Sequence, residues 1–394
     1  MQPLTAPASP ARGRWIWTLS GLATVSLLAV LGASAFARAE GVHGGTPLSA
    51  VPTRTVVVPQ AVTSLSVASY GAPIRVARGP VSQVTVIEAI TFDGQDGAPA
   101  VTTTVSGGAL TLAAPSCVDT GCSVAFTVTV PASVAVNAAS EGGEISVSGA
   151  AMANLDSGGG PVTARGTQGA LTVTAEGGSI TATGAGSADL DSGGGPITAS
   201  AVSGTVTADA DGGSITARQT GAADLDSGGG PITASAVSGT VTANADGGSI
   251  TVTGSTGATL DSGGGPVIAR RVGGPLTAST DGGELQVDRL AAPLSADTGG
   301  GPVNASGIAS ATFRVTTDGG GASVSFVAVP QAVQVTTNGG PAVLELPGGP
   351  YAVTADSFGG PEQVSVPVSP SAAGTVSVST GGGELQVTPG GPGT

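Results

Sequence analysis

One nine-residue phrase decides the fold of this chain, because it returns five times at nearly constant spacing. It reads DSGGGPVTA at Asp156, DSGGGPITA at Asp191 and Asp226, DSGGGPVIA at Asp261 and DTGGGPVNA at Asp297. Successive copies are 35, 35, 35 and 36 residues apart. A fixed interval of this size is the signature of a repeat architecture.

The 35-residue unit divides into two halves of similar design. A second phrase stands between the copies of the first and reads EGGSITA at Glu176, DGGSITA at Asp211, DGGSITV at Asp246 and DGGELQV at Asp281. Aligning both phrases on the apolar residue after the glycines gives a column with steps of 17 or 18 residues: Ile145, Val162, Ile180, Ile197, Ile215, Ile232, Ile250, Val267, Leu285 and Val303. One coil is therefore about half of the repeat.

Each coil holds two short segments in which apolar residues alternate with Thr or Ser, the pattern of a strand. The second segment supplies pairs such as Ala188/Leu190 and Val206/Ala208. In most neighbouring coils a pair with the small residue first is followed by a pair with the large residue first, which is how side chains stacked in a narrow interior would share volume. We predict an all-β fold, a parallel β-solenoid (β-helix) with about 17–18 residues and two short strands per coil. An antiparallel meander of successive segments is the alternative.

The glycines and prolines are expected to form the corners. We expect the Gly-Gly turns to supply the positive φ angles that tight corners need. We expect the prolines after the glycines at the first position of a strand, where a missing N–H is tolerated: Pro161, Pro196, Pro231, Pro266 and Pro302.

The composition agrees with a thin solenoid. Gly and Pro number 67 and 27 of 394 residues, and their regular period distinguishes the chain from low-complexity sequence. Aromatic residues are 3% of the chain, too few for an ordinary large core. All 12 basic residues are Arg and the net charge is −14, which argues against nucleic acid or an anionic membrane surface as a partner.

The N-terminal residues predict export. Residues 1–14 contain Arg12, Arg14 and no acid, and residues 15–37 carry no charge and are long enough to span a bilayer. The basic flank predicts a cytoplasmic tail, a single-pass transmembrane helix in the cell membrane and an extracytoplasmic C-terminal part. A cleaved signal sequence, giving a secreted product, is the alternative, because Ala35-Phe-Ala37 and Ala37-Arg-Ala39 resemble cleavage sites.

The remaining chain divides by regularity. We expect a linker over 38–53 that holds the only histidine, His43, an irregular β cap over 54–137, regular repeats over 138–309, irregular coils over 310–388 and a tail over 389–394. Cys117 and Cys122 stand in the cap, and in an exported chain we predict a disulfide between them. Two free thiols are the alternative, since C-x4-C lacks the further ligands of a zinc site.

Three sequence features resemble one bacterial family. They are the run Phe126-Thr-Val-Thr-Val-Pro131, the run Glu141-Gly-Gly-Glu-Ile-Ser-Val147 and the repeated G-G-x-I-x-V units. Together they resemble the "putative adhesin" family, a β-strand-repeat domain of largely unknown function related to the toastrack domains of envelope-stress proteins. The similarity covers nearly everything after the linker, although the doubled GGGP turns are more regular than the family pattern. It implies adhesion or envelope sensing, and it offers no catalytic residue.

An acidic row stands six residues before the apolar column: Asp156, Thr174, Asp191, Asp209, Asp226, Asn244, Asp261, Ser279 and Asp297. Further acids follow two residues later in alternate coils: Glu176, Asp211, Asp246 and Asp281. Carboxylates about 5 to 10 Å apart could share Ca²⁺, and the candidate ligands are Asp191, Asp209, Asp211 and Asp226. The alternative is that Asp and Asn cap the turns. No other metal or cofactor is expected.

Two other functions are weaker hypotheses. A row of threonines directly after the column suggests ice binding, but Arg165, Arg218 and Arg270 interrupt the row beside it, and outward Thr is common in strands. Acid pairs such as Asp209 and Asp226 suggest a polysaccharide-cleaving enzyme, but the absence of Lys, the scarcity of aromatics and the short coils argue against one.

We therefore expect a non-enzymatic, membrane-anchored, extracytoplasmic solenoid. It would present one acidic, Thr/Ser-rich face to an envelope or surface protein or glycan, for adhesion or cell-envelope scaffolding. The alternatives are a sensor arm of an envelope-stress system and a self-assembling structural protein that associates through exposed end coils.

Overall fold

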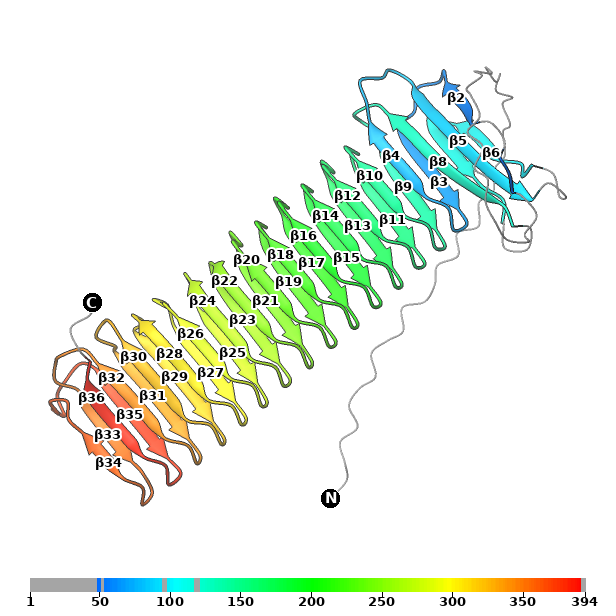
Figure 1. The fold of residues 1–394 in the computed structure, drawn as a ribbon. Coiled ribbons are helices and arrows are strands. Elements are labelled where there is room, and N and C mark those ends of the chain that lie inside the picture. The colour runs from blue at the N-terminus through cyan, green and yellow to red at the C-terminus, as the bar shows by residue number, and fades with distance from the viewer. Residues whose placement is uncertain (1–47, 51–52, 94–97, 117–120, 391–394) are drawn as a thin grey trace.

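The structure, a computed structural model, describes residues 48–50, 53–93, 98–116 and 121–390. Over these residues the chain is all-β and forms a long, flat stack of coils (Figure 1). The predicted cytoplasmic tail at 1–14, the predicted transmembrane segment at 15–37 and His43 lie outside the described residues. Among the residues that are described, no helix has the length and hydropathy needed to cross a membrane.

One sheet, which we call sheet A, holds the apolar column. Its strands in the regular part are β10 (Ile145–Ser148), β12 (Val162–Arg165), β14 (Ile180–Thr183), β16 (Ile197–Ser200), β18 (Ile215–Arg218), β20 (Ile232–Ser235), β22 (Ile250–Ser255), β24 (Val267–Val272), β26 (Leu285–Asp288) and β28 (Val303–Ile308). Neighbouring strands are parallel and in register, with Ile197 opposite both Ile180 and Ile215. The predicted parallel solenoid is confirmed, and the meander alternative is wrong.

The second sheet, sheet B, supplies the other strand of each coil. Its strands in the regular part are β9 (Ala135–Ser140), β11 (Ala153–Ser157), β13 (Ala170–Ala175), β15 (Ser187–Ser192), β17 (Thr205–Ala210), β19 (Ala222–Ser227), β21 (Thr240–Ala245), β23 (Gly257–Ser262), β25 (Leu276–Thr280) and β27 (Leu294–Thr298). The register places Ala188 beside Val206 and Leu190 beside Ala208, so large residues alternate with small ones as predicted.

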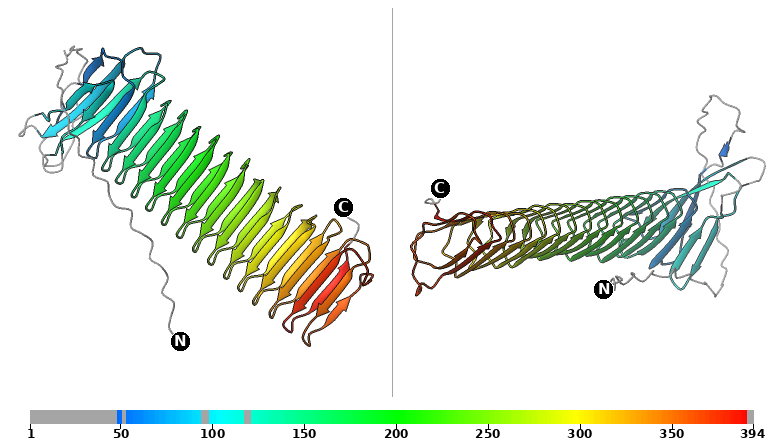
Figure 2. Two further views of the ribbon diagram at one scale, coloured as in Figure 1. Left: turned by 180° about the vertical axis from the view of Figure 1, so that it is seen from behind. Right: turned by 90° about the horizontal axis from the view of Figure 1, so that it is seen from below.

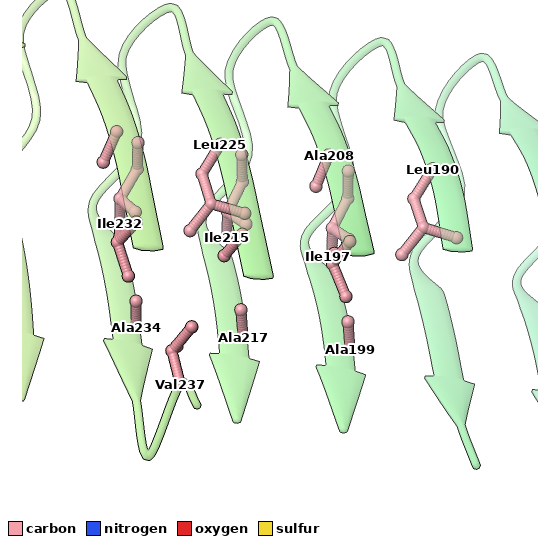
Figure 3. Packing of buried hydrophobic residues seen from close by; sticks show 14 of the residues in the cluster. Leu190, Ile197, Ala199, Ala208, Ile215, Ala217, Leu225, Ile232, Ala234 and Val237 are labelled. Atoms are coloured by element: carbon pink, nitrogen blue, oxygen red, sulfur yellow. The ribbon is translucent and has the colours of Figure 1, made fainter. Parts of the chain in front are cut away.

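The core is a narrow strip between the two sheets. Figure 3 shows Leu190, Ala208 and Leu225 in one row, with the side chains of Ile197 and Ile215 in the same interior. All five are 1% exposed. Seen along its edge, the molecule is a thin plate with little twist (Figure 2). Because each layer is one coil thick, small and β-branched residues fill it without aromatics.

The glycines of the repeated phrase provide space and not positive φ angles. Gly228, Gly229 and Gly230 all lie outside the positive-φ region. A Cβ on Gly228 would clash with the carbonyl oxygen of Asp211, and one on Gly230 would clash with that of Gly213. The expectation that these turns need positive φ was wrong, because the actual demand at this corner is the close approach of backbones in neighbouring coils.

Positive φ angles occur instead at the opposite corner, where each strand of sheet A ends. Gly184, Ala201, Gln219, Ala236 and Gly254 have φ angles of 68°, 53°, 54°, 53° and 74°. One left-handed residue per coil therefore turns the chain back toward sheet B, and several coils accept a side chain there at some cost. The prolines also differ from expectation by one position: Pro196 precedes β16, and its carbonyl accepts a hydrogen bond from the Ile180 N–H at 3.0 Å.

Antiparallel strands close the N-terminal end. The coil of β3 (Ser64–Ser69) and β4 (Ile74–Arg78) pairs with β9 and β10 on one side and with β7 (Ala109–Ala113) and β8 (Ser123–Val130) on the other. Beyond them, β5 (Val84–Asp93) is antiparallel to β8, and β1 (Leu48–Ala50) and β2 (Arg54–Val58) are antiparallel to β5. Strand β6 (Thr102–Ser106) is antiparallel to β7. Strand β1 lies in a stretch that we expected to be an unstructured linker.

The C-terminal coils are not stacked in chain order. After β29 (Thr312–Thr317), β30 (Ala322–Phe326), β31 (Ala332–Thr337) and β32 (Ala342–Leu346), the chain forms the outermost coil from β33 (Ala352–Asp356) and β34 (Glu362–Val364). The chain then returns, and β35 (Thr375–Thr380) and β36 (Leu385–Pro389) form a coil that lies between the coil of β31 and β32 and the coil of β33 and β34. Glu362 takes the position of the apolar column beside Leu385. Glu362 is exposed, and a charged residue on an edge strand discourages pairing with another chain.

Cys122 is disulfide-bonded. Cys117 lies outside the described residues, so the predicted pairing of the two cysteines stays a prediction.

A buried carboxylate lies in the N-terminal end. The Glu88 side chain on β5 is 0% exposed, and neither of its oxygens has a hydrogen-bond partner. Nη1 of Arg54 lies 3.8 Å from its Oε2. Burial raises the pKa of Glu88 above its ordinary value, and Arg54 offsets this only in part.

We expect Gly230→Ala to lower the free energy of unfolding by about 2 to 3 kcal/mol, because the added methyl group forces two backbones apart. Gly229→Ala is the matched control, since nothing lies within 4 Å of a Cβ at that position. Both changes lose the same glycine freedom in the unfolded chain. Denaturant titration measures the difference, and equal effects would contradict the steric role of the third glycine.

We expect Glu88→Gln to reduce the pH dependence of stability. A raised folded-state pKa means that the folded chain holds the proton more tightly, so the stability from this group is complete below the unfolded pKa of about 4.3. It is lost as pH rises through the folded value. The unmodified chain should therefore lose more stability than the variant between about pH 4 and pH 7. Urea titrations across that range measure this, with exposed Glu141→Gln as the control; parallel curves for Glu88→Gln and the parent would refute it.

Candidate functional site

The two sheets present outward faces of different chemistry. We call the outward residues of sheet B from β11 to β27 the acidic face; none of them is basic: Asn154, Asp156, Thr172, Thr174, Asp189, Asp191, Thr207, Asp209, Asp224, Asp226, Thr242, Asn244, Thr259, Asp261, Thr277, Ser279, Ser295 and Asp297. We call those of sheet A from β12 to β24 the hydroxyl–arginine face; none is acidic: Thr163, Arg165, Thr181, Thr183, Thr198, Ser200, Thr216, Arg218, Thr233, Ser235, Thr251, Thr253, Ile268 and Arg270.

The acidic face also carries Thr and Ser, as expected, whereas the threonine row that follows the apolar column lies on the opposite side of the plate. The reason is that the chain reverses direction at the glycine corner, so outward positions on the two strands of a coil point away from each other. Figure 3 shows the strands of the two sheets running in opposite directions.

The predicted acidic row is confirmed as a lateral row. Asp209 lies between Asp191 and Asp226 in register, with neighbouring strands about 4.8 Å apart. The Asn244 side-chain amide next in the row donates a hydrogen bond to Oδ1 of Asp226 at 3.4 Å. An amide in the row therefore supplies a donor where another carboxylate would repel.

Sequence reasoning missed a second row on the same face. Asp189 and Asp224 stand two residues before the first row, with Thr207 between them in register. The signal was present in the sequence, because the D-L-D pattern at 189–191 and 224–226 places both carboxylates of each strand on the same side. Three neighbouring strands thus carry five exposed carboxylates.

The second set of predicted acids lies at the glycine corner. Asp211 is adjacent to Gly228, the equivalent residue in the following coil. Carboxylates therefore alternate between strand end and corner through ten successive coils: Asp156, Glu176, Asp191, Asp211, Asp226, Asp246, Asp261, Asp281, Asp297 and Asp318. This staggering keeps like charges farther apart than a straight row would, which reduces their repulsion.

A buried hydroxyl closes the glycine corner from inside, and the sequence analysis did not identify it. The Ser227 hydroxyl donates to the Gly230 carbonyl at 3.0 Å and accepts from the Gly230 N–H at 2.9 Å. Ser192 and Ser262 make the same pair of bonds in their own coils. The second residue of the repeated phrase thus fixes the turn that positions the neighbouring Asp.

The candidate Ca²⁺ ligands do not converge on one point. Asp191, Asp209 and Asp226 stand in a straight row, and Asp211 stands at the corner. Within the described part of the chain, no group of three or more His, Cys, Asp or Glu side chains is arranged to hold a metal ion. Ca²⁺ binding stays a prediction.

The acidic face is hollowed at its N-terminal end. A cavity of about 460 Å³ is lined there by Tyr70, Glu141, Asp156 and Glu176, among others. Tyr70 is 36% exposed. The ring and the three carboxylates together extend the polar, negative surface to the first coils of the solenoid.

No protein-family model matches the sequence. No curated protein matches it either. Solved structures similar to this chain include three bacterial proteins. A putative adhesin from Bacteroides fragilis has 14% identity, a TM-score of 0.28 and coverage of 65% of this chain and 97% of its own. A putative cell adhesion protein from Clostridium sporogenes has 6% identity and a TM-score of 0.18, and the match covers 86% of this chain and 98% of that protein. A putative adhesin from Parabacteroides merdae has 10% identity and a TM-score of 0.18, and the match covers 87% of this chain and 97% of that protein. Two of these three proteins are described as putative adhesins and the other as a putative cell adhesion protein.

We expect Asp209→Asn to stabilise the fold by about 0.2 to 1 kcal/mol, because Asp209 lies between two like charges. Asp261→Asn is the control and should have a smaller effect, since its neighbours are Asn244 and Ser279. Thermal unfolding at low and high salt measures this, and the gain should shrink in high salt. Repeating the scans with millimolar Ca²⁺ and with chelator tests the metal hypothesis: an unchanged melting temperature of the parent would remove it.

Proposed function

We propose that this chain is a non-enzymatic adhesion protein that binds its partner through the acidic face. The observation that carries the proposal is the staggered series of carboxylates along the acidic face and the glycine corner beside it, one per coil through ten coils, held on a flat and regular plate. A single exposed ion pair contributes only about 0 to 1 kcal/mol. An extended row of them suits a partner that makes many weak contacts at once.

The rigidity of the plate supports this role. Each strand of the regular part pairs with a neighbour on both sides, so the spacing of the carboxylates is fixed before binding. A preformed surface loses little conformational entropy on association. The partner should be extended and carry cationic or hydrogen-bond-donating groups, as a surface protein or a glycan can.

We further propose that the chain is anchored in the cell membrane through residues 15–37, with the solenoid outside the cytoplasm. Coils are about 4.8 Å apart, so the stack from β7 to β34 would reach about 70 Å from its first coil. The antiparallel strands would then lie nearest the membrane and the C-terminal coils farthest from it. A plate of this length, standing upright on the membrane, would place the acidic face well beyond the lipid headgroups.

Adherence of cells that carry the full chain tests this function. A single-membrane bacterium producing the chain should adhere to cells or to a glycan-coated surface better than the same host without it. The combined change of Asp191, Asp209 and Asp226 to Asn should reduce adherence at least severalfold. The matched control removes three exposed carboxylates outside the acidic face, with Glu345 and Glu384 changed to Gln and Asp356 changed to Asn. Equal adherence of host, parent and variants would refute the proposal.

A further inference from the structure

We infer that the acidic face binds the hydroxyl–arginine face of a second copy of this chain, with the two solenoids stacked antiparallel. This inference rests on the proposed function, because it names the partner of the acidic face. Its first support is charge: from β11 to β27 the outward residues of sheet B include carboxylates and no basic group, and from β12 to β24 those of sheet A include guanidinium and hydroxyl groups and no acid, with Asp288 following beside Arg270 on β26. Each copy therefore carries both halves of a complementary pair of surfaces.

The spacing of the charges supplies the second support. Arg165, Arg218 and Arg270 are 53 and 52 residues apart and stand on β12, β18 and β24. The sequence separations repeat in the acidic row, where Asp156, Asp209 and Asp261 are also 53 and 52 residues apart, on β11, β17 and β23. Arginines and aspartates thus occupy the same three coils, with two coils between each.

The position of the charges across the plate selects the orientation. The acidic row lies beside the glycine corner, whereas the arginines lie beside the positive-φ corner: Arg165 and Arg218 end their strands, and Arg270 directly precedes the positive-φ residue Arg271. Simple translation of one plate onto another would place these rows at opposite edges. Rotation by half a turn about the normal to the sheets reverses both the axis and the edges, and the rows then coincide.

In the antiparallel stack each charged coil meets its counterpart. Arg218 faces Asp209 of the second copy, while Arg165 faces its Asp261 and Arg270 faces its Asp156. The remaining acids meet hydroxyl donors, because Asp226 lies over the coil of Ser200 and Asp191 lies over the coil of Ser235. Carboxylates that accept from hydroxyl groups replace hydration with direct hydrogen bonds.

The contact is small and opposed by net charge. Seven coils span about 30 Å and the strands about 15 Å, which gives an interface of the size found in transient complexes. The net charge of −14 repels at long range, and salt of physiological strength screens that repulsion beyond about 8 Å. Single pairs should therefore be weak, and rows of copies on two facing surfaces should hold through multivalency. If two copies are anchored by their N-termini on two cell surfaces that face each other, their solenoids point in opposite directions, which is the antiparallel orientation.

Crosslinking between full-length copies in detergent tests the stack and its orientation. The coil of β17 and β18 is the centre of the antiparallel stack, so the coil of β13 in one copy meets the coil of β22 in the other. Thr172→Cys on β13 should therefore crosslink to Thr251→Cys on β22 through a short bis-maleimide. Thr172→Cys with Thr181→Cys on β14 is the matched pair for a parallel stack. The parent chain controls for the native cysteines. Product from the first pair supports the inference; product from the second pair alone, or from neither, overturns it.

Charge variants test the cause. Changing Arg165, Arg218 and Arg270 together to Gln should reduce the crosslinked product at least tenfold, and changing them to Lys should retain it. Arg314→Gln, on β29 outside the paired coils, should have no effect. An unchanged yield in the Gln variant would overturn the inference. Adherence without crosslinking would leave the proposed function with a different partner, and crosslinking without adherence would keep the stack and reject adhesion.

Discussion

Backbone contact between successive coils at the glycine corner is the constraint on which the rest of the structure depends. At this corner the carbonyl of one coil occupies the space that a Cβ of the next would need, as Gly213 does for Gly230. The corner hydroxyls, such as that of Ser227, bond within this contact. A stack this tight keeps both sheets in parallel register, and register in turn decides which side chains become neighbours.

The same contact explains why the sequence repeats every two coils. A residue with a side chain, such as Asp211, occupies the corner in one coil, and the equivalent Gly228 makes room for its backbone in the next. The charged positions follow this alternation, so neighbouring carboxylates are staggered between corner and strand. Asp191, Asp209 and Asp226 are the exception, a straight run of three like charges. Like charges directly opposite each other on neighbouring strands are destabilising.

The ends of the solenoid differ from its middle for a physical reason. A strand edge without a partner exposes N–H and C=O groups that could pair with another chain. Antiparallel strands close the N-terminal end, and at the C-terminal end Glu362 stands where an apolar residue would otherwise continue the column. These features discourage growth through end coils, whereas the two flat faces remain open to contact. Association is therefore better served by the faces than by the ends.

The sequence by itself determined the parallel stack, the coil length and the rows, because a period of 17 or 18 residues brings chemically matching positions together again and again. It could predict that Ile197 meets Ile215 and that Asp191 meets Asp209. Only the tertiary structure decided that the acidic row and the threonine row after the apolar column face opposite ways, since that depends on how the chain folds back at each corner. It also decided that the corner residues must be glycine because the backbone of the neighbouring coil leaves no room for a Cβ, and that the Ser227 hydroxyl closes the turn. Those facts depend on contacts between coils, which a linear pattern does not contain.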